Sequence, residues 1–342
     1  MLKIVQKVHR IRTLLESVNE THPGLGRASA FAVMTNHAKR MLLLVAPPGC
    51  GKSQITDALA AAIPGSMKLD VATEAGLQPF KDQLTGFRSL VTLDDLAGMK
   101  SSYRREVTLS TLAGLGYRHS TEIHTGFQHL SITDYQGSCV CGCQPVTLAP
   151  IVQSDIWSGM IADKTVRYYH IFRPTAPTED KLNLEIPDSI PVEAVEAPNL
   201  AEAVYKPALA ISRVQWSLGR VLEHTSWMLR ALAGLDSRKR VNKLDVELFT
   251  ELGKGMILER HILDRDNLEG PYRFRLDFLA LLIMFCTYGR FTIKTLCDEH
   301  KISQRTAYSI MERYRPMWIM LGAQPSLYGP SADLQAIIDE VI

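Results

Sequence analysis

Residues 40–63 read RMLLLVAPPGCGKSQITDALAAAI, and the expected architecture of the chain follows from this stretch. The aliphatic run from Met41 to Val45 is typical of a strand that is buried on both faces of a parallel sheet. A turn rich in glycine and proline comes next, and the alanine-rich remainder from Lys52 favours a helix. The stretch therefore predicts a strand, a tight loop and a helix in succession, within an α/β sheet.

The octapeptide from Ala46 to Ser53, APPGCGKS, matches the phosphate-binding P-loop pattern at every position but the first, where alanine replaces glycine. Glycines let backbone N–H groups turn inward around phosphates, and the helix that follows presents its positive end to the same anion. The lysine is expected to reach the β and γ phosphates, and the serine hydroxyl to bind Mg²⁺. The sequence thus predicts a site for ATP and Mg²⁺, with ligand contacts from Pro48, Gly49, Cys50, Gly51, Lys52, Ser53 and Gln54.

A second aliphatic run, Ser89 to Leu93, predicts another buried strand, and it ends in the acids Asp94 and Asp95. We expect Asp94 to hold Mg²⁺ through water and Asp95 to polarise the attacking water, a role more often filled by glutamate. The two aspartates also suit the N-cap of a helix that begins near Leu96, and both roles can coexist.

Further elements are expected around these motifs. Residues 1–20 have the periodicity of an amphipathic helix, 67–71 of a short strand and 101–115 of a helix. Residues 129–145, HLSITDYQGSCVCGCQP, predict two strands around a turn at 136–137. Three cysteines alternate along the second of these strands, so they share one face, which we interpret as buried and inert rather than as a metal site: Cys139, Cys141 and Cys143.

The second half of the chain changes character. Residues 173–207 are rich in proline and acids, which indicates a linker or extended arm, and long helical stretches follow at 208–235 and 243–263. The expected domains are an ATPase core with its N-terminal helix at 1–175, a linker at 176–207, a helical lid at 208–268 and a winged helix-turn-helix domain at 269–342.

The last of these domains contains TIKTLCDEHKISQRTAYSIMERYRP, with Ser303 as an N-cap between two helices. The second helix carries the side chains that we expect to contact double-stranded DNA: Gln304, Arg305, Tyr308 and Arg313. A small winged-helix fold used for packing or protein contacts is the alternative interpretation.

Over about residues 30–260, the chain resembles the AAA+ superfamily of oligomeric ATPases. The features that carry this resemblance are APPGCGKS, LVTLDD, a strand with a polar end and a helical lid. The resemblance implies a homo-oligomeric ring or arc. It also implies that Gln144 contacts the γ phosphate or the water as sensor one. A cation from a neighbouring subunit would act on the γ phosphate; Lys164 and Arg167 fit this role, with Arg104, Arg105 and Arg118 as competitors.

The stretch SLGRVLEHTSWMLRALAGLDSRKRVNKLDVELF resembles the helical lid of MoxR-like and MCM-like ATPases. In those lids an arginine early in a helix reaches back to the nucleotide. Arg220 fits that position best, and Arg213 is the second choice.

Composition sets outer limits on function. A net charge of +2 requires no nucleic-acid or membrane partner overall, and no apolar run reaches the roughly 18 residues of a membrane span. A cysteine inside the phosphate loop favours a reducing, cytoplasmic location. We therefore expect an AAA+ ATPase that acts on DNA as a replication initiator, helicase loader or helicase, a class that includes proteins of phages and mobile elements. The alternatives are a MoxR-like protein-remodelling ATPase with a protein client and a non-hydrolysing nucleotide switch.

Overall fold

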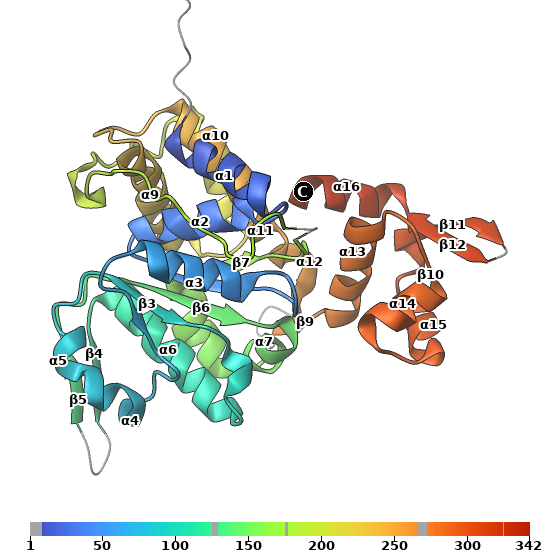
Figure 1. Ribbon diagram of the computed structural model, residues 1–342, viewed down its shortest axis with the longest axis horizontal. Coiled ribbons are helices and arrows are strands. Elements are labelled where there is room, and N and C mark those ends of the chain that lie inside the picture. The colour runs from blue at the N-terminus through green and yellow to red at the C-terminus, as the bar shows by residue number, and fades with distance from the viewer. Residues whose placement is uncertain (1–8, 125–128, 175–176, 266–271, 324) are drawn as a thin grey trace, which may run out of the picture.

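The computed structural model describes residues 9–124, 129–174, 177–265, 272–323 and 325–342. A five-stranded parallel sheet in the order β2-β3-β6-β1-β7 forms its centre (Figure 1). The strands are β1 (Met41–Val45), β2 (Met67–Lys68), β3 (Leu90–Leu93), β6 (Ser138–Cys143) and β7 (Thr165–Tyr169). The predicted α/β class, with a parallel sheet between helices, is confirmed.

Helices cover both faces of this sheet, which explains why its strands are apolar without alternation. Leu42 and Leu44 face the helices α1 (Arg10–Thr21), α2 (Gly26–His37) and α3 (Lys52–Ala62). Leu43 and Val45 point the other way, into a core shared with α6 (Ser102–Arg118) and α7 (Pro145–Ile151). The first core gathers the N-terminal helices, and the second gathers those that follow β3 and β6.

The cysteines of β6 confirm the expectation of a buried face. Cys139, Cys141 and Cys143 have no exposed surface and belong to the core on the α6 side of the sheet. Burial raises the pKa of the Cys139 thiol to about 12. Within the described ranges, no group of three or more His, Cys, Asp or Glu side chains could hold a metal ion by itself.

The segment before β6 differs in part from expectation. Two strands flank the turn at 136–137, but they lie in different sheets. β5 (His129–Ile132) pairs with β4 (Thr121–His124), whereas β6 enters the central sheet. The short helices α4 (Glu74–Leu77) and α5 (Lys81–Leu84) lie between β2 and β3 in sequence.

The proline-rich segment contains little regular structure, as predicted, but it does not hang free. Leu182, Leu184 and Val192 are buried in the core of the N-terminal helices, together with residues of the later helix α9 (Leu218–Leu235). The helices that follow are α8 (Lys206–Ser212), α9 (Leu218–Leu235), α10 (Lys243–Leu252), α11 (Lys254–Ile257) and α12 (Glu259–Ile262). The proline-rich segment therefore packs as a strap against the N-terminal helices and α9.

Residues 276–323 and 325–342 form a lobe at the right of Figure 1, which we call the C-terminal lobe. A short hairpin of β8 (Leu263–Arg265) and β9 (Tyr272–Phe274) leads into it. Its helices are α13 (Leu276–Tyr288), α14 (Ile293–His300), α15 (Gln304–Arg313) and α16 (Ala332–Val341). Its strands β10 (Phe291–Thr292), β11 (Trp318–Ala323) and β12 (Ser326–Pro330) form an antiparallel sheet in the order β10-β12-β11. None of the helices in the described part of the chain is both long and apolar enough to cross a bilayer.

Candidate functional site

The β1–α3 loop (residues 46–51) lies at the carboxyl end of β1, which runs between β6 and β7 in the sheet. Gly49 and Gly51 have φ angles of +78° and +76°, in the left-handed region that glycine enters without strain. Ala46 needs no such freedom, because it keeps a negative φ and its N–H continues the ladder by donating to the Cys143 carbonyl at 3.0 Å. An alanine at the first position of the loop is therefore compatible with its shape.

Lys52 begins α3 directly after the loop, and its side chain is buried at the end of the sheet. Its Nζ lies 3.0 Å from Oδ2 of Asp95, which follows β3. The same carboxylate oxygen accepts a hydrogen bond of 2.9 Å from Nε2 of Gln144, which follows β6. Three side chains that the sequence assigned to one site therefore meet at the carboxyl ends of three adjacent parallel strands.

Asp95 also caps the turn that follows it, which is the capping role expected from the sequence. Its Oδ1 accepts a hydrogen bond of 2.9 Å from the backbone N–H of Ala97. One carboxylate oxygen thus fixes the backbone while the other faces Lys52 and Gln144.

Asp94 lies beside this cluster with a different environment. Its Oδ2 is 4.0 Å from Nζ of Lys68, while its Oδ1 is buried and has no hydrogen-bond partner among the described residues. A buried oxygen without a partner is rare and calls for a ligand such as water or a cation. The donor set near the loop, a serine hydroxyl and a carboxylate, is of the oxygen type that Mg²⁺ prefers.

The close approach of β3 to β6 depends on Gly142, which sequence inspection did not single out. Leu93 pairs with Cys141 in the parallel register, so Asp94 comes opposite Gly142. A Cβ at this position would lie 1.9 Å from the Asp94 carbonyl oxygen and 3.8 Å from Cδ of Lys52. The glycine lets the two acids approach Lys52.

The extension of β7 forms another wall of the loop. The His170 N–H donates to the Val45 carbonyl at 2.8 Å, and the Cys50 thiol points to the Ile171 carbonyl, 3.9 Å away. Burial lowers the pKa of His170 to about 4, so this imidazole is neutral near pH 7. Arg173 follows this extension and lies near Cys50. Sequence reasoning missed this arginine, since it belongs to no motif.

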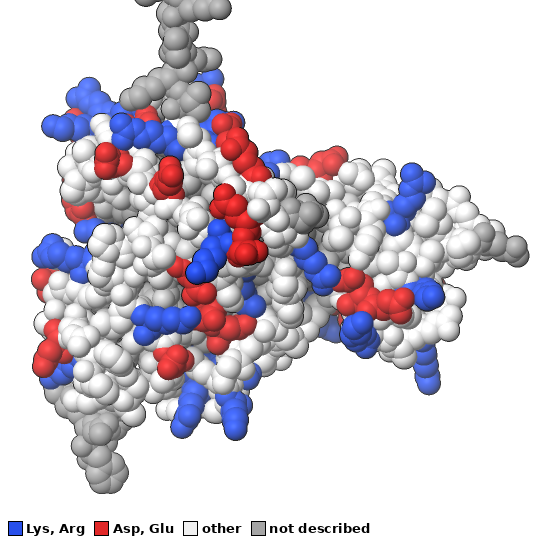
Figure 2. Space-filling view, in the orientation of Figure 1, with Lys and Arg blue, Asp and Glu red and all other residues white. Residues whose placement is uncertain are grey.

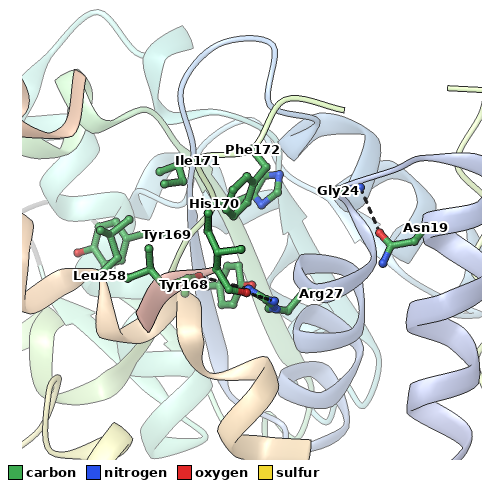
Figure 3. Close-up of a pocket in the computed structure, with 12 residues that line it drawn as sticks. Asn19, Gly24, Arg27, Tyr168, Tyr169, His170, Ile171, Phe172 and Leu258 are labelled. Carbon is green, nitrogen blue, oxygen red and sulfur yellow. Dashed lines mark hydrogen bonds between the residues drawn. The ribbon is translucent and has the colours of Figure 1, made fainter. Parts of the chain in front are cut away.

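A cavity of about 180 Å³ opens beside the same extension (Figure 3). Its lining comes from the α1–α2 turn, the end of β7, α11 and the C-terminal end of α16. Leu25 of that turn also reaches toward Gly51, where an added Cβ would lie 2.7 Å from a Leu25 methyl. Arg27 donates to the backbone carbonyls of Val341 and Ile342 at the edge of the cavity. The cavity and the β1–α3 loop are therefore neighbours.

The two cations expected to act between subunits lie inside the protomer. Arg167 is buried and makes a two-pronged ion pair with Glu259, at 2.7 and 2.9 Å. It also donates to backbone carbonyls, among them that of Gln215. Lys164 is buried as well. Neither side chain is presented to a neighbouring molecule in this conformation.

The competitors for this role differ in exposure. Arg104 is exposed, and Arg105 is half-buried, with its Nε bonded to the Met99 carbonyl. The side chain of Arg118 lies outside the described part of the structure. Of the two competitors whose side chains are described, Arg104 is the one that is open to a neighbouring molecule.

Arg220 does not approach the loop either. It stacks on the ring of Tyr117, 4.3 Å from its centroid, and pairs with Glu223 at 3.0 Å. Glu223 also pairs with Arg40, which precedes β1. The β1–α3 loop lies at the carboxyl end of β1, whereas Arg40 lies at its amino end. Arg220 is therefore at the end of the strands opposite the loop. The expectation that it contacts nucleotide within its own subunit does not fit this position. Arg213 is exposed at the end of α8.

On α15, the expected DNA-contacting residues Gln304, Arg305 and Tyr308 are exposed on one face of the helix. Arg313 at its end is exposed too, but it forms an ion pair with Asp277 of α13. The neighbouring edge strand β11 exposes three consecutive apolar side chains, Ile319, Met320 and Leu321. Sequence reasoning missed this last feature, since a short apolar run is equally typical of a buried strand.

No protein-family model matches the chain, and no curated protein sequence matches it either.

Proposed function

We propose that this chain is a P-loop ATPase of the AAA+ type that binds ATP with Mg²⁺ at the β1–α3 loop and hydrolyses it. The observation that carries the proposal is the convergence of Lys52, Asp95 and Gln144, with contacts of 3.0 and 2.9 Å, at the end of the strand that enters the loop. An incidental glycine-rich turn would not require a buried lysine, an acid and an amide from three strands at the same point.

The residues have separate roles in this proposal. Lys52 neutralises the β and γ phosphates, and backbone N–H groups of the loop and the first turn of α3 cradle them. Ser53 and the Oδ1 of Asp94, which has no hydrogen-bond partner among the described residues, are the oxygens that would hold Mg²⁺. When bound, the ion would supply positive charge that neutralises the phosphates.

Asp95 orients the attacking water and accepts its proton, while Gln144 positions the water or a γ-phosphate oxygen. The water oxygen forms a bond to the γ phosphorus, and the bond from that phosphorus to the bridging oxygen of ADP breaks. In the structure Lys52 neutralises Asp95. The arriving phosphates would draw Lys52 away from this carboxylate, so the base becomes available only when substrate is bound.

The decisive experiment compares steady-state ATP turnover of the full chain with that of Lys52→Ala and Asp95→Asn, and with the control Lys206→Ala. Lys206 is an exposed lysine on α8. We expect each site variant to lose about 100-fold or more in kcat, as is typical when a preorganised charge at the transferring phosphate is removed. Equal rates in all four proteins would reject the site. ATP binding that requires Lys52, without turnover in the wild type, would instead identify a nucleotide switch.

The exposed face of α15 is the surface that we propose acts on double-stranded DNA, within a winged-helix arrangement of α13 to α15 and the β10-β12-β11 sheet. Gln304, Arg305 and Tyr308 offer hydrogen-bond donors and an aromatic ring in the first turns of a helix, where groove-reading helices carry theirs. On the face seen in Figure 2, acidic and basic side chains are interspersed. DNA contact would therefore depend on this local helix face rather than on overall charge.

A second candidate, docking of a protein client as in MoxR-like remodelling, is favoured by β11. Ile319, Met320 and Leu321 are 48%, 54% and 50% exposed on a strand at the edge of its sheet. An apolar edge strand is suited to strand addition by another protein and unsuited to a phosphate backbone. Met320→Lys should abolish client docking and leave DNA binding unchanged, so the two functions can be separated.

Assembly into a ring or arc is part of the same proposal. A trans-acting cation must lie on the surface, and the exposed Arg104 at the start of α6 meets that requirement better than Arg167. Mixing Lys52→Ala with Arg104→Ala subunits tests it. Each variant alone should be impaired, and activity should return in the mixture, because intact sites can then receive the arginine from a neighbour.

A further inference from the structure

Arg173 connects the β1–α3 loop with the C-terminal lobe. Its guanidinium forms an ion pair with Glu299 of α14. It also lies near the loop, because the Cys50 thiol is 3.9 Å from the carbonyl of Ile171, two residues before Arg173, and the positive charge of Arg173 opposes the rise in the pKa of this thiol that burial causes. Arg173 therefore pairs with a helix of the lobe and lies beside the loop expected to hold phosphate.

Glu299 is held from the lobe side as well. Its second oxygen accepts a hydrogen bond of 2.8 Å from the Tyr288 hydroxyl, at the end of α13. The Glu299 side chain is 17% exposed, whereas that of Arg173 is 41% exposed. The acid is thus a fixed part of the lobe, and the arginine has the freedom to exchange partners.

The backbone that carries Arg173 is fixed on the core. Gly24, in the α1–α2 turn, packs against this backbone, and a Cβ added to it would lie 3.8 Å from both the Arg173 carbonyl oxygen and the Phe172 Cβ. Upstream, His170 is bonded to Val45. Any exchange therefore involves the side chain of Arg173 and the lobe, not movement of the strand.

A phosphate group competes well for such an arginine. Guanidinium binds phosphate oxygens in a planar, two-pronged geometry, and a nucleoside triphosphate carries more charge than a single carboxylate. The cost of leaving Glu299 is modest, since a partly exposed ion pair typically contributes little to stability. Bound triphosphate can therefore outcompete the carboxylate.

We propose that Arg173 is an additional phosphate-binding residue and that Glu299 restrains it when no nucleotide is bound. Binding of a nucleoside triphosphate transfers the guanidinium from Glu299 to the phosphates and releases α14 from the core. The inference rests on the proposed function, because it requires nucleotide at the β1–α3 loop. By linkage, a lobe released from the core also binds nucleotide more tightly.

The test measures affinity for MgATP in the full chain by calorimetry at fixed salt, with a slowly hydrolysed ATP analogue as ligand. Glu299→Gln frees Arg173, and it should tighten binding by about 3- to 10-fold, at the lower end of coupling between sites. Arg173→Gln should weaken binding, and Arg173→Lys should restore part of the loss, since charge is kept but the two-pronged geometry is not.

Glu340→Gln is the matched control. Glu340, on α16, pairs with Arg260 and His261 of α12, so it also joins the lobe to the rest of the chain but does not touch the loop. Its affinity for MgATP should equal that of the wild type. Hydrogen exchange provides a second measurement: nucleotide should speed exchange of α14 amides in the wild type and not in Arg173→Gln.

The outcomes separate the two proposals. If the wild type binds no nucleotide, the proposed function fails and this inference fails with it. If nucleotide binds and depends on Lys52 but Glu299→Gln has wild-type affinity, only the exchange by Arg173 is rejected. Equal tightening by Glu299→Gln and Glu340→Gln would also reject it, because general loosening of the lobe would then explain both.

Discussion

Gly142 is the residue on which the geometry of the site depends most narrowly. Gly142→Ala places a Cβ 1.9 Å from the Asp94 carbonyl oxygen, a backbone atom that cannot turn aside. Strands β3 and β6 must separate, which should lower the free energy of unfolding by about 3 kcal/mol. Asp95 moves away from Lys52 at the same time. Urea unfolding and ATP turnover measure the two effects.

Gly114→Ala is the matched control, because Gly114 lies within α6 and a Cβ there meets no atom within 4 Å. Alanine is the better helix former, so this variant should be stabilised by up to about 1 kcal/mol. A Gly142→Ala protein as stable and active as the wild type would show that β3 and β6 do not hold the acids in place.

The thiols of β6 give a second prediction at this scale. Burial raises the pKa of Cys139 to about 12 and that of Cys141 well above its usual value. Since only thiolate reacts with iodoacetamide, the folded protein should resist alkylation at both positions even at about pH 9. Cys286 and Cys297 are both half-buried, but burial raises the pKa of Cys286 to about 12, so Cys297 should react first. Mass spectrometry identifies the sites, and urea-unfolded protein, reactive at every cysteine, is the control.

Single residues were predictable where a motif fixes their place along the chain. The spacing of Lys52, Asp94, Asp95 and Gln144 put all four at the ends of adjacent strands, and the structure brings Lys52, Asp95 and Gln144 into contact. Which aspartate faces the lysine was not predictable, because consecutive side chains diverge and the turn after β3 sets their directions. Arg173 was also beyond reach, since its partner lies far along the sequence, in another lobe.

At the scale of elements, the sequence predicted those with strong periodicity. The strands β1 and β3 and the helix α3 lie where their apolar patterns indicated. The hairpin partner of β5 was missed, because β4 is short and largely polar. The proline-rich segment was predicted to be a linker, and its scattered leucines and valine have no period from which their burial against α9 could be inferred.

The exposed face of α15 leads to a prediction for that helix. Arg305 is exposed without an ion-pair partner in the described structure, whereas Arg313 is engaged by Asp277. Arg305→Ala should weaken binding of double-stranded DNA by the full chain about tenfold and lower the slope of log affinity against log salt by about one. Arg313→Ala should do so less, because its charge is already compensated. Fluorescence anisotropy at several salt concentrations measures both.

Two results would contradict this assignment. The first is DNA affinity unchanged by Arg305→Ala, and the second is affinity that falls equally in both variants. Either result would favour docking of a protein client at the apolar edge strand β11 as the function of the lobe, and Met320→Lys would then be the informative variant.

For the whole molecule, the position of α9 could not be predicted from the periodicity of its sequence. α9 was expected to bring an arginine to the nucleotide, but Arg220 lies with Tyr117 and Glu223 at the other end of the strands. The sequence of α9 specifies a helix with one apolar face. It does not specify which end of the strands its first turn approaches, since that depends on the buried contacts of α2, α8 and the proline-rich strap. Relative placement of elements is a tertiary property.

Two buried histidines contribute to the pH dependence of the stability of the whole chain. Burial lowers the pKa of His170 to about 4 and that of His224 to about 3, so both are neutral in the folded protein. In the unfolded chain each takes up a proton near pH 6.5. Between about pH 6.5 and about 4 the unfolded state therefore binds more protons, and the free energy of unfolding falls as pH falls.

The contribution of each histidine approaches about 1.4 kcal/mol per pH unit below about pH 6, and it is absent above about pH 7.5. Urea unfolding of nucleotide-free protein at several pH values between about 7.5 and 5 measures the slope. His224→Gln is the discriminating variant: glutamine can still donate to the Asp163 carbonyl, which Nε2 of the histidine contacts at 3.1 Å, but it does not titrate. Loss of stacking on Trp216 should lower its stability at every pH, while its curve becomes flatter on the acid side. Parallel curves for the two proteins would mean that the pKa of His224 is the same in the folded and unfolded chain, and the acid sensitivity would then have to come from His170 and other titrating groups.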